Sequence, residues 1–275
     1  MLKVRNKLLV GSVFVSGERT RTWYNLQIEF LKKTTKSFKH LVFLNGETDQ
    51  SIFTESEIVD SQDHDAVKIL NGNAQSSNHL VGLKCLFDNF MKMGADHYLF
   101  LDCDCFPIKK DWMPWLLKRM HNKHKGVAAP VRTENLDVFP HPSALFVRGH
   151  CLNADWFNME IGSLNNLMDT PTSDVGAKIP MKLCYPLLRT NYFNPHPIFA
   201  AVYGHAFYHH TCGTRPRGMV TRAMSEGIFE HFVSNHWAIE EMLFNELASN
   251  PDRFVSRLMG DYDNFTQVKN DLLMS

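Results

Sequence analysis

The chain has 275 residues, of which 44% are hydrophobic and 21% charged, and its 29 Lys and Arg balance 29 Asp and Glu to a formal net charge of zero. This composition excludes disordered and fibrous chains, and the charge balance argues against attraction of the whole chain to nucleic acid or an anionic membrane. Because we find no internal repeat, low-complexity tract or linker, we expect a single domain over residues 1–275.

The N-terminus has a basic start and an apolar stretch, as a signal peptide also has. We expect a β-strand at 8–15 instead, because this segment is rich in β-branched residues and no small-residue cleavage site follows it. No stretch reaches the roughly 18 apolar residues of a membrane span. The six cysteines form no C-x-x-C pair, which favours reduced thiols over a disulfide framework. These features predict a cytoplasmic protein without a membrane span.

Strand-like and helix-like segments alternate through the first half of the chain. In order, the patterns predict a strand at 8–15, a helix at 21–33, a strand at 40–44, a helix at 80–93, a strand at 97–101, a helix at 112–120 and strands at 127–130 and 144–147. Such alternation is typical of an α/β fold with a mostly parallel, twisted sheet and helices on both faces. In these folds ligands bind beyond the carboxyl ends of the strands.

The second half of the chain has a less regular pattern. Its prolines predict an irregular, loop-rich and substrate-facing region at 162–197. The longest helical pattern covers 226–248 and ends at Asn250-Pro251.

Two aspartates follow the predicted buried strand at 97–101. Asp102 and Asp104 are two residues apart, so strand-end geometry can turn both side chains toward one point beyond the sheet edge. Converging carboxylates suit a hard divalent cation such as Mg²⁺ or Mn²⁺, which also binds phosphate oxygens. Aspartate is also common in solvated turns, which is the alternative for this pair. The apolar strand before the pair and Phe106-Pro107 after it favour the metal-binding interpretation.

Two adjacent histidines are candidates to complete such a centre. His209 and His210 would point to opposite faces of a strand, so we expect only one of them to reach the site. A neutral imidazole is a good third ligand for Mn²⁺, and Arg215 just beyond could offset the charge of a diphosphate. Because the chain has 14 His, a solvated pair on the surface is the alternative, and Arg215 could equally be solvated.

Three further polar residues have both a functional and an ordinary interpretation. Asp174 could take a proton from an acceptor hydroxyl, or it could cap a helix. Asn78 and His79 precede the predicted helix at 80–93 and could face an anion together with free backbone N–H groups. An ordinary N-cap by the neighbouring serines is the alternative there.

The segment that begins Asn78-His79-Leu-Val-Gly82 continues through Ala95-Asp96 and the apolar strand to Asp102-Cys-Asp104-Cys-Phe-Pro107. This run resembles the middle of a GT-A-type, nucleotide-sugar-dependent glycosyltransferase related to glycosyltransferase family 2. The resemblance implies a GT-A fold with a Rossmann-like nucleotide-binding half at about 1–107, an acceptor half at about 108–220 and a C-terminal helical region at 221–275.

The same resemblance implies roles for single residues. Asp102 would contact the donor or the metal, and Asp104 would be a direct ligand of Mn²⁺ or Mg²⁺. The segment with His209, His210 and Arg215 resembles one that completes metal or diphosphate binding in such enzymes. Asp174 falls where an inverting member carries its catalytic carboxylate.

The predicted activity is the metal-dependent transfer of a sugar from a nucleoside diphosphate sugar, a UDP- or GDP-sugar in the first place, to an acceptor hydroxyl. We expect the nucleoside beyond the first strand near Ser16 and Arg21, with Asp60 as a candidate to contact the base or ribose. Arg132 and His141 could line a pocket for a glycan or another hydroxyl-bearing acceptor, a modified nucleic acid included. The alternatives are a sugar-phosphate nucleotidyltransferase, a hydrolytic metalloenzyme, and a non-catalytic nucleotide- or glycan-binding relative.

Overall fold

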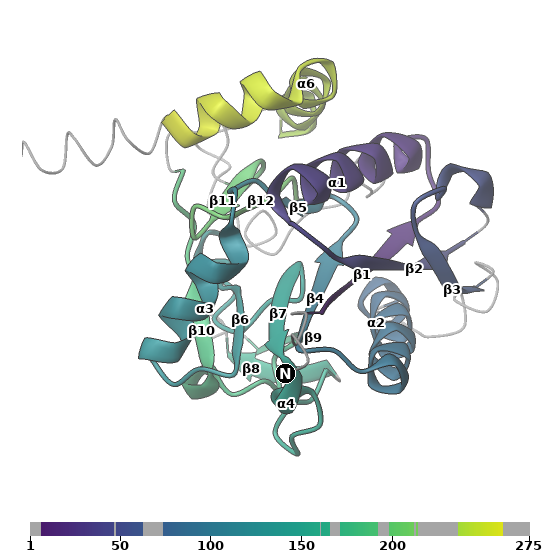
Figure 1. Ribbon diagram of the computed structural model, residues 1–275. Coiled ribbons are helices and arrows are strands. Elements are labelled where there is room, and N and C mark those ends of the chain that lie inside the picture. Colours follow the sequence, from purple (N-terminus) through teal and green to yellow (C-terminus); the bar gives the residue numbers. More distant parts are fainter. Residues whose placement is uncertain are drawn as a thin grey trace, which may run out of the picture.

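A seven-stranded sheet forms the centre of the protein, whose structure is a computed structural model that describes residues 7–46, 48–62, 74–159, 161–165, 171–191, 198–211, 213 and 236–260. The strand order is β10-β6-β7-β4-β1-β2-β3 (Figure 1). The strands are β1 (Leu8–Val15), β2 (Lys39–Asn45), β3 (Glu57–Gln62), β4 (His97–Asp102), β6 (Val127–Pro130), β7 (Ala144–Arg148) and β10 (Cys184–Leu187). All neighbours are parallel except β7, which runs antiparallel to β4 and β6. The predicted α/β fold with a mostly parallel sheet is confirmed.

Helices cover both faces of this sheet, as predicted. Helices α1 (Thr20–Thr34) and α2 (Ala74–Met93) lie on opposite sides of β1 and β2 (Figure 1). Successive side chains of a strand point to opposite faces, so Phe14 of β1 packs in the cluster of α1 whereas Val13 packs with Phe90 of α2. Helix α3 (Trp112–Asn122) covers the face of α1 further along the sheet, where Trp112 packs edge-on against Phe146 of β7.

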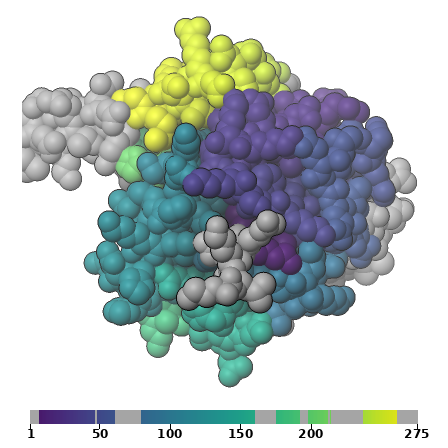
Figure 2. Space-filling view, in the orientation of Figure 1, coloured from purple at the N-terminus to yellow at the C-terminus, as the bar shows by residue number. Residues whose placement is uncertain are grey.

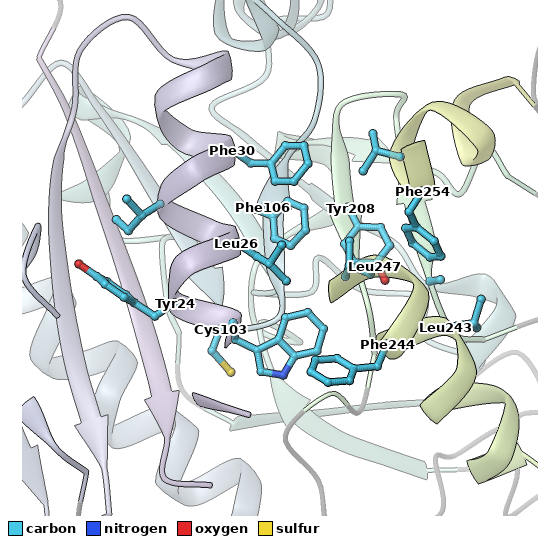
Figure 3. Packing of buried hydrophobic residues seen from close by; sticks show 14 of the residues in the cluster. Tyr24, Leu26, Phe30, Cys103, Phe106, Tyr208, Leu243, Phe244, Leu247 and Phe254 are labelled. Atoms are coloured by element: carbon cyan, nitrogen blue, oxygen red, sulfur yellow. The ribbon is translucent and has the colours of Figure 1, made fainter. Parts of the chain in front are cut away.

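The C-terminal helix α6 (His236–Ser249) lies across α1. In the space-filling view its surface, in yellow, sits directly on that of α1 (Figure 2). The close-up in Figure 3 shows Phe244 and Leu247 of α6 facing Leu26 of α1 in one buried cluster. The helix ends directly before Asn250-Pro251, as predicted, and 251–260 is helical again. Residues 226–235 of the predicted helix lie outside the described residues.

Two small antiparallel sheets complete the described fold. One has the order β11-β12-β5, and the other is the hairpin of β8 and β9. Their strands are β5 (Cys105–Pro107), β8 (Ile161–Asn165), β9 (Pro171–Val175), β11 (Ala201–Tyr203) and β12 (Phe207–His209). The short helices are α4 (Gly149–Leu152), η1 (Gln50–Ile52), η3 (Thr133–Asn135) and η4 (Met181–Leu183).

The prediction that 162–197 is irregular is wrong for much of this segment, which contains most of β8 and all of β9 and β10. Two prolines account for the error, because they occupy positions where strands tolerate proline. Pro171 is the first residue of β9, and Pro186 lies on β10, an edge strand of the central sheet. Residues 166–170 and 192–197 lie outside the described part.

Five cysteines of the described chain, Cys85, Cys103, Cys105, Cys151 and Cys184, are free thiols. Among the helices that the structure describes, none has the length and apolar character needed to cross a membrane.

Candidate metal centre

The end of β4 and the start of β5 position the two predicted aspartates. Strand β4 ends at Asp102 and β5 begins at Cys105, so Cys103 and Asp104 form the turn between them. Asp102 lies opposite Val13, near the carboxyl end of the parallel strand β1. Asp104 is buried, whereas 20% of the Asp102 side chain is exposed. The pair therefore lies at the carboxyl edge of the sheet, and Asp102 has contact with solvent.

His209 reaches the same turn from the small sheet. Strand β12 pairs antiparallel with β5, and the register sets His209 opposite Cys105, the residue after Asp104. His209 Nε2 lies 3.4 Å from Asp104 Oδ1 and 3.6 Å from Asp102 Oδ2. One ligand atom from each of the three residues lies within 4.8 Å of the other two. A segment more than 100 residues away in sequence thus supplies the third side chain of the group.

The three side chains can hold a divalent cation. Two carboxylates and an imidazole are the oxygen and nitrogen donors that Mn²⁺ accepts, and Mg²⁺ favours the carboxylates. Asp102 Oδ1 is buried, and even with His79 Nε2 at 3.0 Å it keeps a lone pair to offer. With a cation bound, a proton on His209 Nδ1 could be donated to Thr211 Oγ1, 3.4 Å away, which would leave the Nε2 lone pair for the cation. This donor set fits Mn²⁺ or Mg²⁺.

The charges around the two carboxyl groups keep both ionised. Burial alone would raise their pKa values, but neighbouring histidines outweigh it. His79 and His209 lower the pKa of Asp102 below its usual value, against desolvation and the repulsion of Asp104. For Asp104, His209, His210 and the Gly213 N–H outweigh desolvation and hold the pKa far below the usual value. Ionised carboxylates are the form that metal binding requires.

His210 does not join the group, so only one of the two candidate histidines reaches the aspartates, as expected, and that one is His209. The His210 ring is fully buried, with Nδ1 2.6 Å from the Tyr208 hydroxyl and Nε2 2.9 Å from Glu240 Oε1. Glu240 of α6 also accepts a hydrogen bond of 2.5 Å from Arg19 Nη1. Both ring nitrogens of His210 are therefore engaged away from the aspartates, in an ionic network that joins α6 to the start of α1.

The backbone after β12 fixes Asp104 in place. The Gly213 N–H donates to Asp104 Oδ2 at 2.9 Å, and the His210 N–H donates to the Asp104 carbonyl at 3.0 Å. The Trp23 indole donates in turn to the Gly213 carbonyl at 3.0 Å. Only glycine fits at 213, because a Cβ there would lie 2.6 Å from the Trp23 ring and 2.9 Å from Asp104 Oδ2.

His79 comes to the metal centre from α2. Its Nε2 lies 3.0 Å from Asp102 Oδ1 and lowers the pKa of that carboxyl group. Helix α2 starts at Ala74, so the predicted start at residue 80 is wrong and Asn78 and His79 lie within the helix. The alternative of an N-cap by the neighbouring serines is also wrong, because Ser76 and Ser77 lie inside the helix as well. The Asn78 side chain lies outside the described part of the chain.

The other predicted donor-side residues are spread along the carboxyl edge. Ser16 directly follows β1, and its N–H donates to the carbonyl of Asn45 at the end of β2. The exposed Arg21 guanidinium lies 3.5 Å from Asp49. Asp60 is exposed on β3, and two strands, β2 and β1, separate it from β4. Arg215 lies outside the described residues.

The two predicted acceptor-side residues have different surroundings. The His141 ring stacks against the His209 ring, with centroids 6.3 Å apart, and its Nδ1 accepts a hydrogen bond from the Ser143 N–H. Arg132 is buried and forms an ion pair of 2.5 Å with the fully buried Asp137. His141 thus lies beside the metal centre, while the Arg132 guanidinium is already neutralised.

Asp174 lies in β9, opposite Gly162 of β8, so the alternative of a helix N-cap is wrong. Its side chain lies outside the described part of the structure. Two residues further on, Gly176 (φ +90°) approaches the Pro140 carbonyl so closely that a Cβ would lie 2.1 Å from the oxygen. Because Pro140 directly precedes His141, the chain after Asp174 touches the loop that carries a neighbour of the metal centre.

Sequence reasoning missed two side chains near the centre, Glu240 and Gln27. Glu240 belongs to a helix whose pattern predicted packing only. Gln27 is fully buried on the apolar stripe of α1. The sequence does indicate that Gln27 is buried, because Trp23 and Leu31, four residues to either side, lie on the same apolar face of the helix.

No protein-family model matches the sequence, and no curated protein matches it either. Among solved structures, the galactosyltransferase LgtC in complex with donor and acceptor sugar analogs is similar at 11% identity, over 64% of this chain and 73% of that one, with a TM-score of 0.38. The mannosyltransferase PcManGT from Pyrobaculum calidifontis, solved with GDP-Man and Mn²⁺, is similar at 10% identity over 55% and 46% of the two chains, also at 0.38.

S. aureus TarS, residues 1–349, is similar at 14% identity over 54% of this chain and 48% of that one, with a TM-score of 0.33. This chain thus spans about half the length of TarS and PcManGT. At identities and TM-scores this low, these similarities are resemblances only and carry no argument about what this chain binds or catalyses.

Proposed function

We propose that the protein is a metal-dependent glycosyltransferase, which moves a sugar from a nucleoside diphosphate sugar to an acceptor hydroxyl. The observation that carries this proposal is the convergence of Asp102, Asp104 and His209 at the carboxyl edge of a mostly parallel sheet. That edge is where α/β proteins bind nucleotides, and the group has the ligands that a cation bridging to a diphosphate requires.

The chain's own residues provide the binding steps. Asp102 and Asp104 are held ionised, and Gly213 and His210 anchor Asp104 through backbone N–H groups. A cation bound there supplies positive charge against the negative charge that grows on the leaving nucleoside diphosphate. Ser16, directly after β1, and His79, beside Asp102, are candidates of the donor side.

We assign the role of general base to Asp174, which would take the proton of the acceptor hydroxyl as the sugar is transferred with inversion. The close approach of Gly176 to Pro140, directly before His141, supports a location of β9 on the acceptor side of the metal centre. A base in such a position contributes about 10²–10⁴-fold to the rate. His141, stacked on His209, is the candidate for contact with the acceptor.

The first experiment is a thermal-shift panel of UDP, GDP, CDP, ADP and dTDP, each with and without Mn²⁺, on the wild type, Asp104→Ala and Asp88→Ala. A ligand at about 100 times its Kd stabilises the protein by roughly 2.7 kcal/mol. We expect a Mn²⁺-dependent rise in Tm for one nucleoside diphosphate, which Asp104→Ala abolishes and Asp88→Ala, a substitution on the exposed face of α2, leaves intact. A panel without any shift would contradict the proposal.

The second experiment separates binding from chemistry in Asp174→Asn. This variant should keep the Mn²⁺-dependent thermal shift and lose about 10²–10⁴-fold in the release of nucleoside diphosphate from UDP-glucose or GDP-mannose. The neighbouring Ser173→Ala is the matched control and should keep both. Full turnover by Asp174→Asn would remove Asp174 from the mechanism, and turnover of a nucleoside triphosphate with a sugar phosphate would identify a nucleotidyltransferase instead.

A further inference from the structure

A buried glutamine of α1 spans the turn that carries the two aspartates. Gln27 Nε2 donates one hydrogen bond to the Asp102 carbonyl at 2.9 Å and another to the Cys105 carbonyl at 2.7 Å. These two carbonyls bracket the turn with Cys103 and Asp104. Because carbonyl oxygens only accept, the NH₂ group of Gln27 must face them and its Oε1 must face away. One side chain therefore fixes the spacing of both ends of the turn.

Residues of β1 and β2 hold Gln27 in this orientation. The Ser12 hydroxyl donates to Gln27 Oε1 at 2.7 Å, and Ser12 Oγ lies 3.0 Å from His40 Nε2. Since Ser12 has given its proton to Gln27, it accepts from His40, which must carry a proton on Nε2. His40 Nδ1 then accepts from the Ser56 hydroxyl at 2.7 Å. His40 is thus a neutral, singly protonated imidazole between two hydroxyl groups.

The chain of hydrogen bonds ends on the backbone of the segment between β2 and β3. Ser56 Oγ lies 3.0 Å from the Tyr24 hydroxyl, which accepts the Glu55 N–H at 2.9 Å. Because Ser56 donates its hydroxyl proton to His40, it accepts a hydrogen bond from the Tyr24 hydroxyl. The donor and the acceptor of every hydrogen bond in the chain are therefore fixed. The residues of this chain are neutral and largely buried, so they orient Gln27 without placing a net charge near the carboxylates.

We propose that Gln27 is a positioning residue of the metal centre, which sets the separation of the Asp102 and Asp104 carboxylates through the backbone of their turn. The proposal rests on the metal centre of the proposed function. Without the two donors, the buried carbonyls of Asp102 and Cys105 would lack partners, and the turn would relax to satisfy them. Residues that orient metal ligands in this way typically change metal affinity about 10–100-fold when they are substituted.

The test is a Mn²⁺ titration without nucleotide, followed by electron paramagnetic resonance, on the full chain. Gln27→Met keeps the length of the side chain and removes both donors, and its Kd for Mn²⁺ should rise about 10–100-fold. Ser12→Ala removes only the group that orients Gln27 and should raise the Kd by less. Thr35→Val is the matched control, because it removes the oxygen that accepts a buried hydrogen bond from the Trp112 indole, directly after the C-terminal end of α1 and about two helical turns from Gln27.

The outcomes separate this proposal from the proposed function. A raised Kd in Gln27→Met and Ser12→Ala, with the wild-type Kd in Thr35→Val, supports the positioning role. Wild-type Mn²⁺ affinity in both Gln27→Met and Ser12→Ala overturns it and leaves the metal centre intact. If Gln27→Met does not fold, Ser12→Ala decides by the same criterion. If the wild type binds Mn²⁺ no better than Asp104→Ala, the metal centre fails and the positioning role fails with it.

Discussion

The two sides of the turn with Asp102 and Asp104 are built from different chemistry. On the side of α1, Gln27 and the hydroxyl and imidazole groups behind it form a neutral chain of hydrogen bonds. On the side of α6, the backbone N–H groups of Gly213 and His210 donate hydrogen bonds to Asp104. The His210 ring contacts the Glu240 carboxylate, which is also paired with Arg19. One side holds the turn with neutral donors, and the other connects it to charged groups.

Because of this difference, the two sides should respond differently to substitutions and to pH. A neutral hydrogen bond contributes about 1 kcal/mol net, whereas a buried charge that loses its partner costs several times more. The charged side also joins Arg19, His210 and Glu240, so it connects the C-terminal helix α6 to the turn with Asp102 and Asp104. We therefore expect the largest losses of stability on the α6 side and a pH response on the α1 side.

The largest effect should come from Glu240→Ala, which leaves the buried His210 ring and the partly buried Arg19 without their shared carboxylate. We expect a loss of about 3–5 kcal/mol in the free energy of unfolding, measured by urea denaturation. Glu246→Ala in the same helix removes a carboxylate from an exposed pair with Arg257 and should cost about 1 kcal/mol or less. Equal losses in the two variants would show that the buried network contributes no more to stability than an exposed ion pair.

A smaller effect is expected from Gly213→Ala. The added methyl group would collide with the Trp23 ring and Asp104 Oδ2, so the loop must move away from Asp104. Overpacking of this kind costs about 1–3 kcal/mol, and here it should also weaken Mn²⁺ binding. Gly17→Ala, whose Cβ would meet nothing within 4 Å, is the control for both measurements. Unchanged Mn²⁺ affinity in Gly213→Ala would mean that the Gly213 N–H does not hold Asp104 for the metal.

The smallest effect is a pH dependence on the α1 side. Burial lowers the pKa of His40 from 6.5 to about 3, so the unfolded chain binds a proton that the folded protein does not. The stability from neutral His40 is therefore complete above pH 6.5 and is lost as the pH falls from 6.5 toward 3. Between pH 7.5 and 5.5 the wild type should lose about 1.4 kcal/mol more than His40→Gln.

Denaturation curves at the two pH values measure this difference directly. His97, whose pKa burial also lowers, is present in both proteins and cancels in the comparison. Parallel losses in the wild type and His40→Gln would contradict a neutral His40 and, with it, the direction of the protons in the chain that reaches Gln27.

The sequence alone determined most of the secondary structure and the location of the turn with Asp102 and Asp104. The strand at 97–101 and the aspartates after it could be identified because a buried strand is a continuous apolar run and its end is marked by the first polar residues. The helix at 21–33 could be predicted in a similar way, from apolar residues spaced three and four positions apart. These signals are local, since burial and periodicity are written into consecutive residues.

Only the tertiary structure decided how the turn is held. The choice of His209 over His210 depends on the register of β12 against β5, because a shift of one residue would exchange the two faces. The contacts of Gln27 with the turn join residues 75 and 78 positions apart, and that of Gly213 with Asp104 spans 109. No local pattern encodes such pairs: a buried amide or a close-packed glycine acquires its role only when distant elements meet, and the packing of α1, β5, β12 and α6 around one turn brings them together.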